Sequence, residues 1–140
     1  MILIQSWQDA VDLAFKIREV VFIQEQGVPA AIEVDEDDLK ASHALAFDAD
    51  QCVGTGRLIK IDSVRCQIGR MSVLKKYRQQ GIGGQILSAL IEHGKAQGCY
   101  EFHLHAQLTA LPFYEKWGFI AEGKIYMEAG IPHRNMTLLS

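Results

Sequence analysis

The sequence has no hydrophobic run long enough to cross a membrane and no basic, strongly apolar leader at its start. Met1-Ile2-Leu3-Ile4-Gln5 opens the chain, and this apolar segment is too short and too uncharged for a secretory signal. We therefore expect a cytoplasmic protein that has no membrane partner.

Cysteine is scarce, and the few cysteines present show no metal-binding or redox spacing. Cys52, Cys66 and Cys99 are odd in number and contain no Cys-x-x-Cys pair. The five histidines also show no tight ligand spacing with carboxylates or cysteines. The sequence therefore predicts no metal site and three reduced, buried thiols.

An excess of positive charge is also missing. The formal net charge is −3 over 140 residues, which does not suggest nucleic acid as a partner. Hydrophobic residues make up 49% and charged residues 22%, as in ordinary globular proteins. We expect one domain, residues 1–140, with a core of its own.

Hydrophobic periodicity predicts alternating strands and helices. Ser6 and Asp9 form a capping-box pattern before a helix of residues 7–22. Gly54 and Gly56 interrupt one strand, which indicates a bulge or a close backbone approach. The expected strands are residues 2–5, 43–47, 52–61, 65–73, 99–105, 119 onward and 134–139. The further expected helices are residues 81–97 and 112–118. Residues 127–132 are expected to form a loop. These elements predict an α/β sandwich with helices on both faces of the sheet.

The chain is organised around residues 71–87, which lead from a strand end through a basic turn into a glycine-rich helix start. Gly81, Gly83 and Gly84 let a ligand approach the backbone, and free amides at a helix N-terminus bind anionic oxygens. The P-loop pattern is absent, and the dinucleotide pattern G-x-G-x-x-G fails because residue 86 is isoleucine. The stretch predicts a phosphate or pyrophosphate cradle.

Residues 24–42 are strongly acidic and irregular. Such a run is most often a solvated loop. It is also compatible with a loop that attracts a cationic amine to an acceptor site.

Two motifs resemble the GNAT N-acetyltransferase superfamily. Arg78-Gln79-Gln80-Gly81-Ile82-Gly83 fits the acyl-coenzyme-A signature Arg/Gln-x-x-Gly-x-Gly/Ala, and residues 113–119 (FYEKWGF) match the family's second segment. Residues 18–27 and 128–134 resemble the small ElaA-like bacterial subgroup. The resemblance covers nearly the whole chain and implies a GNAT fold of the α+β type, with a mixed, mostly antiparallel sheet of about 6–7 strands and about 4 helices.

The resemblance implies direct acyl transfer from acetyl-CoA, without a metal. The backbone of Met71 and Val73 would pair with the pantetheine arm, the Val73 amide would polarise the thioester carbonyl, and Tyr114 would be the general acid. Gln107 replaces the family's asparagine beside the cofactor arm. The pyrophosphate would be held at Arg78, Gln79, Gln80, Gly81, Ile82, Gly83 and Gly84.

The glutamate base that many members carry on the strand before the cradle is missing. Its position is Gly69, beside Arg70, so the base is another residue or a water chain. His103 and His105 share one strand face and are candidates, although packed or surface histidines are the commoner case. The candidates for the acceptor side are Phe22, Glu25, Asp35, His43, His105 and His133.

The sequence therefore predicts acetyl transfer to a primary amine of a small molecule or peptide, such as a polyamine, an aminoglycoside or lysine. A non-catalytic acyl-CoA-binding regulatory module is the alternative, favoured by the missing strand carboxylate. A nucleotide-binding interaction protein is a weaker third reading. Exposed edge strands are compatible with a homodimer.

Overall fold

The computed structural model describes the backbone of residues 1–140 and the side chains of residues 1–30 and 33–140. Four α-helices and seven strands alternate with short 3₁₀ segments and one π-helical segment. The strands are β1 (Ile2–Ser6), β2 (Ser42–Asp48), β3 (Gln51–Lys60), β4 (Arg65–Val73), β5 (Glu101–Gln107), β6 (Ile120–Glu128) and β7 (Ile131–Leu139). The α-helices are α1 (Trp7–Arg18), α2 (Ala30–Glu33), α3 (Ile82–Ala96) and α4 (Leu111–Glu115). The π-helix is η1 (Glu19–Glu25), and the 3₁₀ segments are η2 (Glu36–Leu39), η3 (Lys75–Tyr77) and η4 (Leu108–Ala110).

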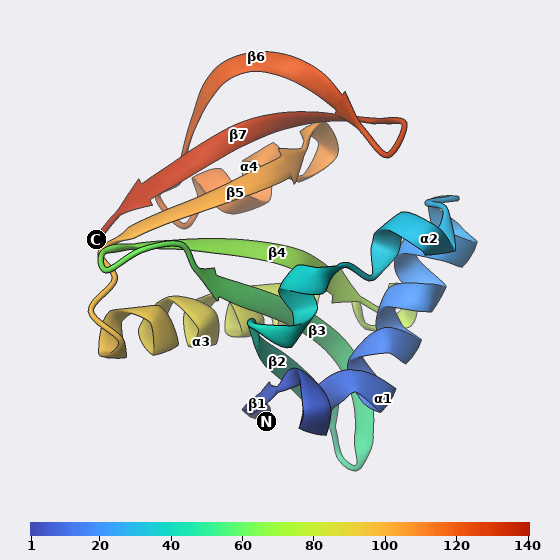
Figure 1. Cartoon of the computed structure of the whole chain (residues 1–140). Helices are drawn as coiled ribbons and strands as arrows, with labels where there is room; N and C mark the ends of the chain where they lie inside the picture. The colour runs from blue at the N-terminus through green and yellow to red at the C-terminus, as the bar shows by residue number, and fades with distance from the viewer.

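All seven strands form one sheet in the order β1-β2-β3-β4-β5-β7-β6. Only β4 and β5 run parallel; every other neighbouring pair is antiparallel. Helix α1 lies on one side of the sheet and α3 on the other (Figure 1). The expected mixed, mostly antiparallel sheet with helices on both faces is confirmed.

The two glycines of β3 allow α3 to lie close to the sheet. A Cβ on Gly54 would lie 2.9 Å from Ile86 Cδ1, and a Cβ on Gly56 would lie 2.7 Å from Met71 Sδ. Ile86, Leu87 and Leu90 of α3 are fully buried in the core. The predicted close backbone approach is therefore confirmed, and it positions α3 and its N-terminus against β4.

Two predictions about element ends were wrong. The N-terminal helix does not stop near residue 22 but changes to a π-helix at Glu19 that runs to Glu25. Residues 127–132 are not a loop, because β6 and β7 continue to a two-residue turn at Ala129 and Gly130, both with positive φ. This Ala-Gly pair adopts backbone angles that usually require asparagine or glycine, so the sequence signal was weak.

The prediction of three reduced thiols was also wrong. Cys66 in β4 and Cys99, two residues before β5, form a disulfide, and their Cα atoms lie 6.3 Å apart. The pair is separated by 33 residues in sequence, and only the parallel packing of β4 and β5 brings it together. Cys52 is free and half-buried.

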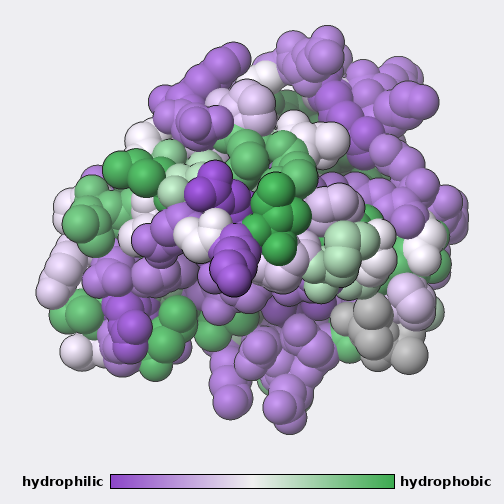
Figure 2. Space-filling view, turned by 90° about the horizontal axis from the view of Figure 1, so that it is seen from above, coloured by the Kyte–Doolittle hydropathy of each residue, from purple (hydrophilic) through white to green (hydrophobic). Residues whose placement is uncertain are grey.

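Strand β6 forms one edge of the sheet and is largely exposed. Ile120, Ile125 and Met127 are each at least 60% exposed. On the face seen from above, hydrophobic residues lie in separate groups among hydrophilic ones (Figure 2). Among the described residues, no helix is long and apolar enough to span a membrane.

Candidate active site

The sheet splits between its two parallel strands. β4 and β5 pair over four residues each, from Arg65 with Glu101 to Ile68 with Leu104, and then separate. In Figure 1 their ribbons meet on the left and diverge to the right. Arg70, with φ +52°, marks the irregular half of β4, where the register with β3 also shifts. The β4 edge at Met71–Val73 therefore faces the split without a β5 partner in the described backbone.

The glycine cradle lies directly beyond this free edge. Gln79 and Gly81 both have positive φ, at +63° and +81°, and they turn the chain into α3. The first α3 hydrogen bond runs from the Gln85 amide to the Gly81 carbonyl, at 3.1 Å. The amides of residues 82–84 thus precede the helix's own ladder and are available to an anion.

The second family motif packs against the first. A Cβ on Gly83 would lie 3.4 Å from Phe113 Cζ, and one on Gly84 would lie 2.9 Å from Trp117 Cζ2. These aromatic side chains also line a hollow of about 710 Å³ beside the cradle. The lack of a side chain at Gly84 therefore leaves room for Trp117, whereas a methyl group on Gly83 would make an ordinary contact with Phe113. Phe113 and Trp117 pack against the start of α3.

The Arg78 side chain forms hydrogen bonds that link the cradle to the end of β4. Its Nε donates to the Val73 carbonyl at 2.8 Å, and its guanidinium donates to both carboxylate oxygens of Glu25. The hydrogen bonds and charge of Arg78 lower the pKa of Glu25. Two residues predicted for different ligands, the cofactor and the acceptor, thus contact each other.

A cavity of about 450 Å³ lies at the mouth of the split. The π-helix, α2, η2, β4, β5, α4 and the β6–β7 hairpin all contribute to its walls. The predicted site residues that line it are Phe22, Asp35, Met71, His105, Gln107, Tyr114 and His133. The structure therefore brings together residues that span more than 110 positions of the sequence.

Tyr114 lies in this cavity wall and is only 8% exposed. Burial raises the pKa of its phenol. A phenol with a raised pKa keeps its proton at neutral pH, which a general acid needs. The Phe113 and Phe119 rings pack edge-on against Tyr114, at 5.0 and 5.9 Å between centroids, and fix its position.

Comparisons with known proteins agree with this geometry. The family model described as an acetyltransferase (GNAT) domain matches residues 11–140. The chain belongs to the GNAT acetyltransferase family. An uncharacterized N-acetyltransferase of Bacillus subtilis, YjcF, is 40% identical over 88% of each chain. Escherichia coli ElaA is 29% identical, with a TM-score of 0.85 and coverage of 99% of both chains.

A more distant GNAT acetyltransferase, from Elizabethkingia anophelis, has been solved with acetyl-CoA bound. It is 18% identical to this GNAT protein, with a TM-score of 0.76 over 99% of this chain and 98% of that one. At this identity the likeness shows the fold alone. The family model and the likeness to ElaA confirm the resemblance to the GNAT superfamily and to the ElaA-like subgroup.

Three residues that were predicted for the acceptor side or as the base of this acetyltransferase do not line the cavity. His43 is 1% exposed, and its Nε2 donates to the Asp38 carbonyl at 3.0 Å. Burial lowers the pKa of His43, which favours its neutral form. Glu25 is held by Arg78, and His103 contacts Glu101 at 2.8 Å outside the cavity wall.

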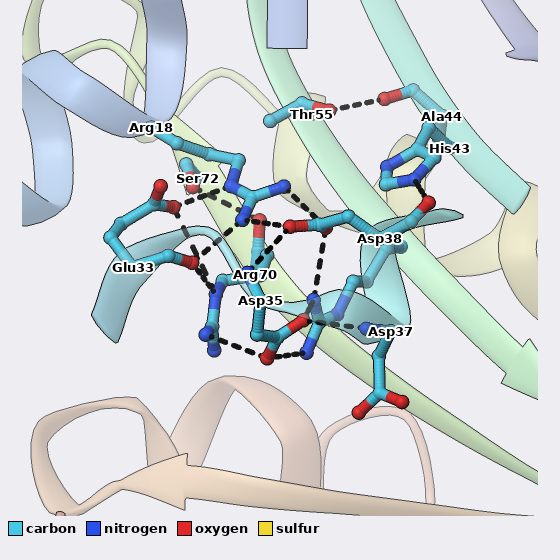
Figure 3. Close-up of polar contacts among 11 residues, drawn as sticks. Arg18, Glu33, Asp35, Asp37, Asp38, His43, Ala44, Thr55, Arg70 and Ser72 are labelled. Atoms are coloured by element: carbon cyan, nitrogen blue, oxygen red, sulfur yellow. Dashed lines mark hydrogen bonds and ion pairs between the residues drawn. The ribbon is translucent and has the colours of Figure 1, made fainter. Parts of the chain in front are cut away.

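The acidic segment is not a freely solvated loop. Three of its carboxylates form ion pairs with three arginines from α1, β3 and β4 (Figure 3). Arg18 pairs with Glu33 and Asp38, and Arg57 pairs with Asp35 and Asp38. We call Arg18, Glu33, Asp35, Asp38, Arg57 and Arg70 the arginine–carboxylate network.

Four members of this network, Glu33, Asp35, Arg57 and Arg70, line the cavity, and the other two, Arg18 and Asp38, are fully buried. Asp38 is fully buried; burial alone would raise its pKa, but hydrogen bonds and charge from Arg18 and Arg57 lower it to about 2. Burial likewise opposes ionisation of Asp35, yet Arg57 and Arg70 lower its pKa. Sequence reasoning missed the three arginines, although Arg18 lies on the buried side of α1, where the other buried residues are apolar.

Proposed function

We propose that this GNAT protein transfers the acetyl group of acetyl-CoA to a primary amine of a small molecule or peptide, with Tyr114 as general acid. The observation that carries the proposal is the free β4 edge at Met71–Val73. It lies between the glycine cradle and the cavity that contains Tyr114.

In this proposal the cofactor completes the sheet locally. The amides of residues 79–84 hold the pyrophosphate, and Arg78 supports the turn. The backbone of Met71 and Val73 pairs with the pantetheine arm, and Gln107 contacts the arm from β5. Gln107 is already positioned by Gln26, to which its amide donates at 2.9 Å.

The reaction is a direct transfer. The neutral amine nitrogen attacks the thioester carbonyl, and the Val73 amide stabilises the negative charge that develops on oxygen. The carbon–sulfur bond then breaks as Tyr114 gives its proton to the departing sulfur. The transfer needs no covalent acyl-enzyme. The free Cys52 lies outside the cavity wall, so its thiol is not placed to accept the acetyl group.

Calorimetry with acetyl-CoA and an assay of released CoA test the proposal. Binding on the order of −8 kcal/mol, a micromolar Kd, is expected. A panel of spermidine, kanamycin, lysine and a lysine-containing peptide supplies the acceptors. Tyr114→Phe should lower kcat by roughly 10²–10⁴-fold while the acetyl-CoA Kd stays within about twofold.

Tyr100→Phe is the matched control, because Tyr100 is half-exposed and lies outside the cavity wall. It should leave both kcat and Kd unchanged. Acetyl-CoA binding without turnover of any amine would favour a non-catalytic acyl-CoA-binding module. Failure to bind acetyl-CoA would refute both functions.

A further inference from the structure

His133 has its two ring nitrogens in different environments. Its Nδ1 lies 2.7 Å from the Ile131 carbonyl oxygen. Because a carbonyl can only accept, Nδ1 carries the hydrogen, and the lone pair of the neutral ring is on Nε2. His133 is only 6% exposed and lines the cavity. It therefore presents a proton-accepting nitrogen in a protected place.

Glu128 lies next to that nitrogen. Its Oε2 is 3.6 Å from His133 Nε2, and its Oε1 accepts from His105 Nδ1 at 3.1 Å. The turn at Ala129 and Gly130 places Glu128 directly opposite Ile131, so the carboxylate stays at the hairpin tip. The side chains of Glu128 and His105 are 44% and 41% exposed, so both reach solvent.

Strand register explains why these groups meet. His133 pairs with Gln107 of β5 on one side and with Tyr126 of β6 on the other. Directly opposed residues share a face, and so do residues two apart in one strand. His105 and Glu128 therefore lie on the same face as His133. The Tyr126 ring stacks on His133 at 6.1 Å between centroids.

We propose that His133 Nε2 accepts the proton of the amine, and that the exposed Glu128 carboxylate then passes this proton to solvent. The proposal rests on the proposed function and supplies the base that β4 lacks at Gly69. His133 and Tyr114 line the same cavity, so base and acid flank one reaction centre.

The proton balance is complete without another reactant. The acceptor nitrogen loses one proton to His133 Nε2 as the nitrogen–carbon bond forms and the carbon–sulfur bond breaks. Glu128 stabilises the resulting imidazolium by its charge. The sulfur receives a proton from Tyr114, which recovers one from solvent after CoA leaves.

Other groups in the cavity are less suited to this role. Glu33 is bound by Arg18, and Asp35 by Arg57 and Arg70. Although burial opposes its ionisation, Arg57 and Arg70 lower the pKa of Asp35, which makes it a weak base, and the ion pair with Arg18 occupies Glu33. Among the described side chains, no group of three His, Cys, Asp or Glu is arranged to hold a metal ion.

The first test is nitrogen NMR of the full ¹⁵N-labelled chain. Long-range ¹H–¹⁵N spectra distinguish the two tautomers of each neutral histidine. We expect His133 as the Nδ1–H form, assigned by the loss of its signals in His133→Asn. An Nε2–H tautomer would overturn the proposal, whether or not an acceptor amine is known.

The second test is kinetic. His133→Asn keeps a side-chain donor near the Ile131 carbonyl but cannot take up a proton. We expect kcat/KM for the best amine of the panel to fall about 10²–10⁴-fold, with the acetyl-CoA Kd unchanged. His103→Asn is the matched control, because His103 lies on the same strand face as His105 but outside the cavity wall.

The pH profile distinguishes a base from a packing residue. In the wild type, the rise of kcat/KM with pH should combine the deprotonation of the acceptor amine with that of the catalytic base, and His133→Asn should lose the part that is due to the base. Glu128→Gln removes the charge that favours the imidazolium, so this part of the rise should move to lower pH. The other titratable or charged groups facing His133 across the cavity or from β6 are Glu33, Asp35, Asp37, Arg57, Arg70, Tyr114 and Tyr126; all are unaltered in both variants.

The outcomes separate this proposal from the proposed function. An active wild type whose His133→Asn variant keeps its kcat/KM and its full rise with pH would overturn His133 as the base. A wild type that acetylates no amine would instead contradict the proposed function and the base with it.

Discussion

Arg78 and Glu25, which stand 53 residues apart, are joined by two hydrogen bonds of 2.7 and 2.8 Å. This contact links the π-helix to the glycine cradle. A pyrophosphate bound at the cradle would compete with Glu25 for the same guanidinium. The Glu25 carboxylate therefore lies where the proposed function places an anionic cofactor.

The first prediction follows from this competition. Arg78→Ala should raise the acetyl-CoA Kd by roughly tenfold or more, because a hydrogen bond to a charged group contributes about 1.5–3 kcal/mol. Glu25→Gln should leave the Kd unchanged or lower it, because the competing charge is gone. Calorimetry measures both values. Arg65→Ala, in an exposed pair with Asp62, is the control, and equal binding by Arg78→Ala would contradict the prediction.

Gly84 and Trp117 test the packing between the two family motifs. Gly84→Ala should destabilise the protein by about 1–3 kcal/mol, because the new methyl group would overlap Trp117. Trp117→Phe should restore part of this loss in the double variant. Urea unfolding of the single and double variants measures the coupling. Ser88→Ala, elsewhere on α3, is the control. If the effects of Gly84→Ala and Trp117→Phe on the free energy of unfolding were additive, the overlap with Trp117 would not be the cause of the destabilisation.

The protonation of Tyr114 gives a third prediction. Because burial raises the pKa of this phenol, Tyr114 should keep its proton beyond about pH 10, the ordinary range for tyrosine. Ultraviolet titration should therefore show the same phenolate absorbance at pH 10.5 for the wild type and for Tyr114→Phe. A larger signal in the wild type would mean that Tyr114 ionises and that its site is more solvated than the structure indicates.

Acid should weaken the arginine–carboxylate network. Asp38 has a folded pKa of about 2, below its ordinary value of 3.8, so its ionised form stabilises the fold above pH 4. This contribution, about 2 kcal/mol, is lost as pH falls from about 4 through 2. Urea unfolding at several pH values measures the loss.

Asp38→Asn should flatten this acid dependence and cost about 3–5 kcal/mol at pH 7, because it leaves Arg18 and Arg57 with an uncompensated buried charge. Asp12→Asn, at an exposed position of α1, should change neither quantity. An unaltered acid profile in Asp38→Asn would assign the acid sensitivity to another carboxylate.

The disulfide gives a fifth prediction. Without reductant, the unfolded protein should take up one alkyl group, at Cys52, and with reductant it should take up three. Reduction should lower the free energy of unfolding by about 3–4 kcal/mol, as expected for a loop of this length. Mass spectrometry counts the alkyl groups; three groups without reductant would show that Cys66 and Cys99 are thiols.

Local patterns in the sequence predicted much of the fold and the cradle. The strands, α3 and the glycine turn each have a short-range signature that survives in the folded chain, because burial alternates along strands and helices with fixed periods. Gly54 and Gly56 even indicated the close approach of α3. The site residues on α3 and α4 followed from two motifs and needed no knowledge of distant contacts.

Groups that depend on distant contacts were not predictable. Arg18, Arg57 and Arg70 are polar residues within otherwise regular elements, and only the sheet order brings them to the acidic segment. Glu128 is likewise an ordinary strand residue until the β6–β7 turn places it beside His133. The disulfide between Cys66 and Cys99 likewise depends on a long-range contact, the parallel pairing of β4 with β5.

The short contact between β4 and β5 has a consequence for folding. Four residue pairs join the two parts of the sheet, β1–β4 and β5–β7–β6, and beyond Ile68 the strands β4 and β5 separate. A cofactor that pairs with this edge supplies the missing hydrogen bonds of a structural strand. Acetyl-CoA at 100 times its Kd would then raise the unfolding free energy by about 2.7 kcal/mol, so the cosubstrate would also act as a part of the fold.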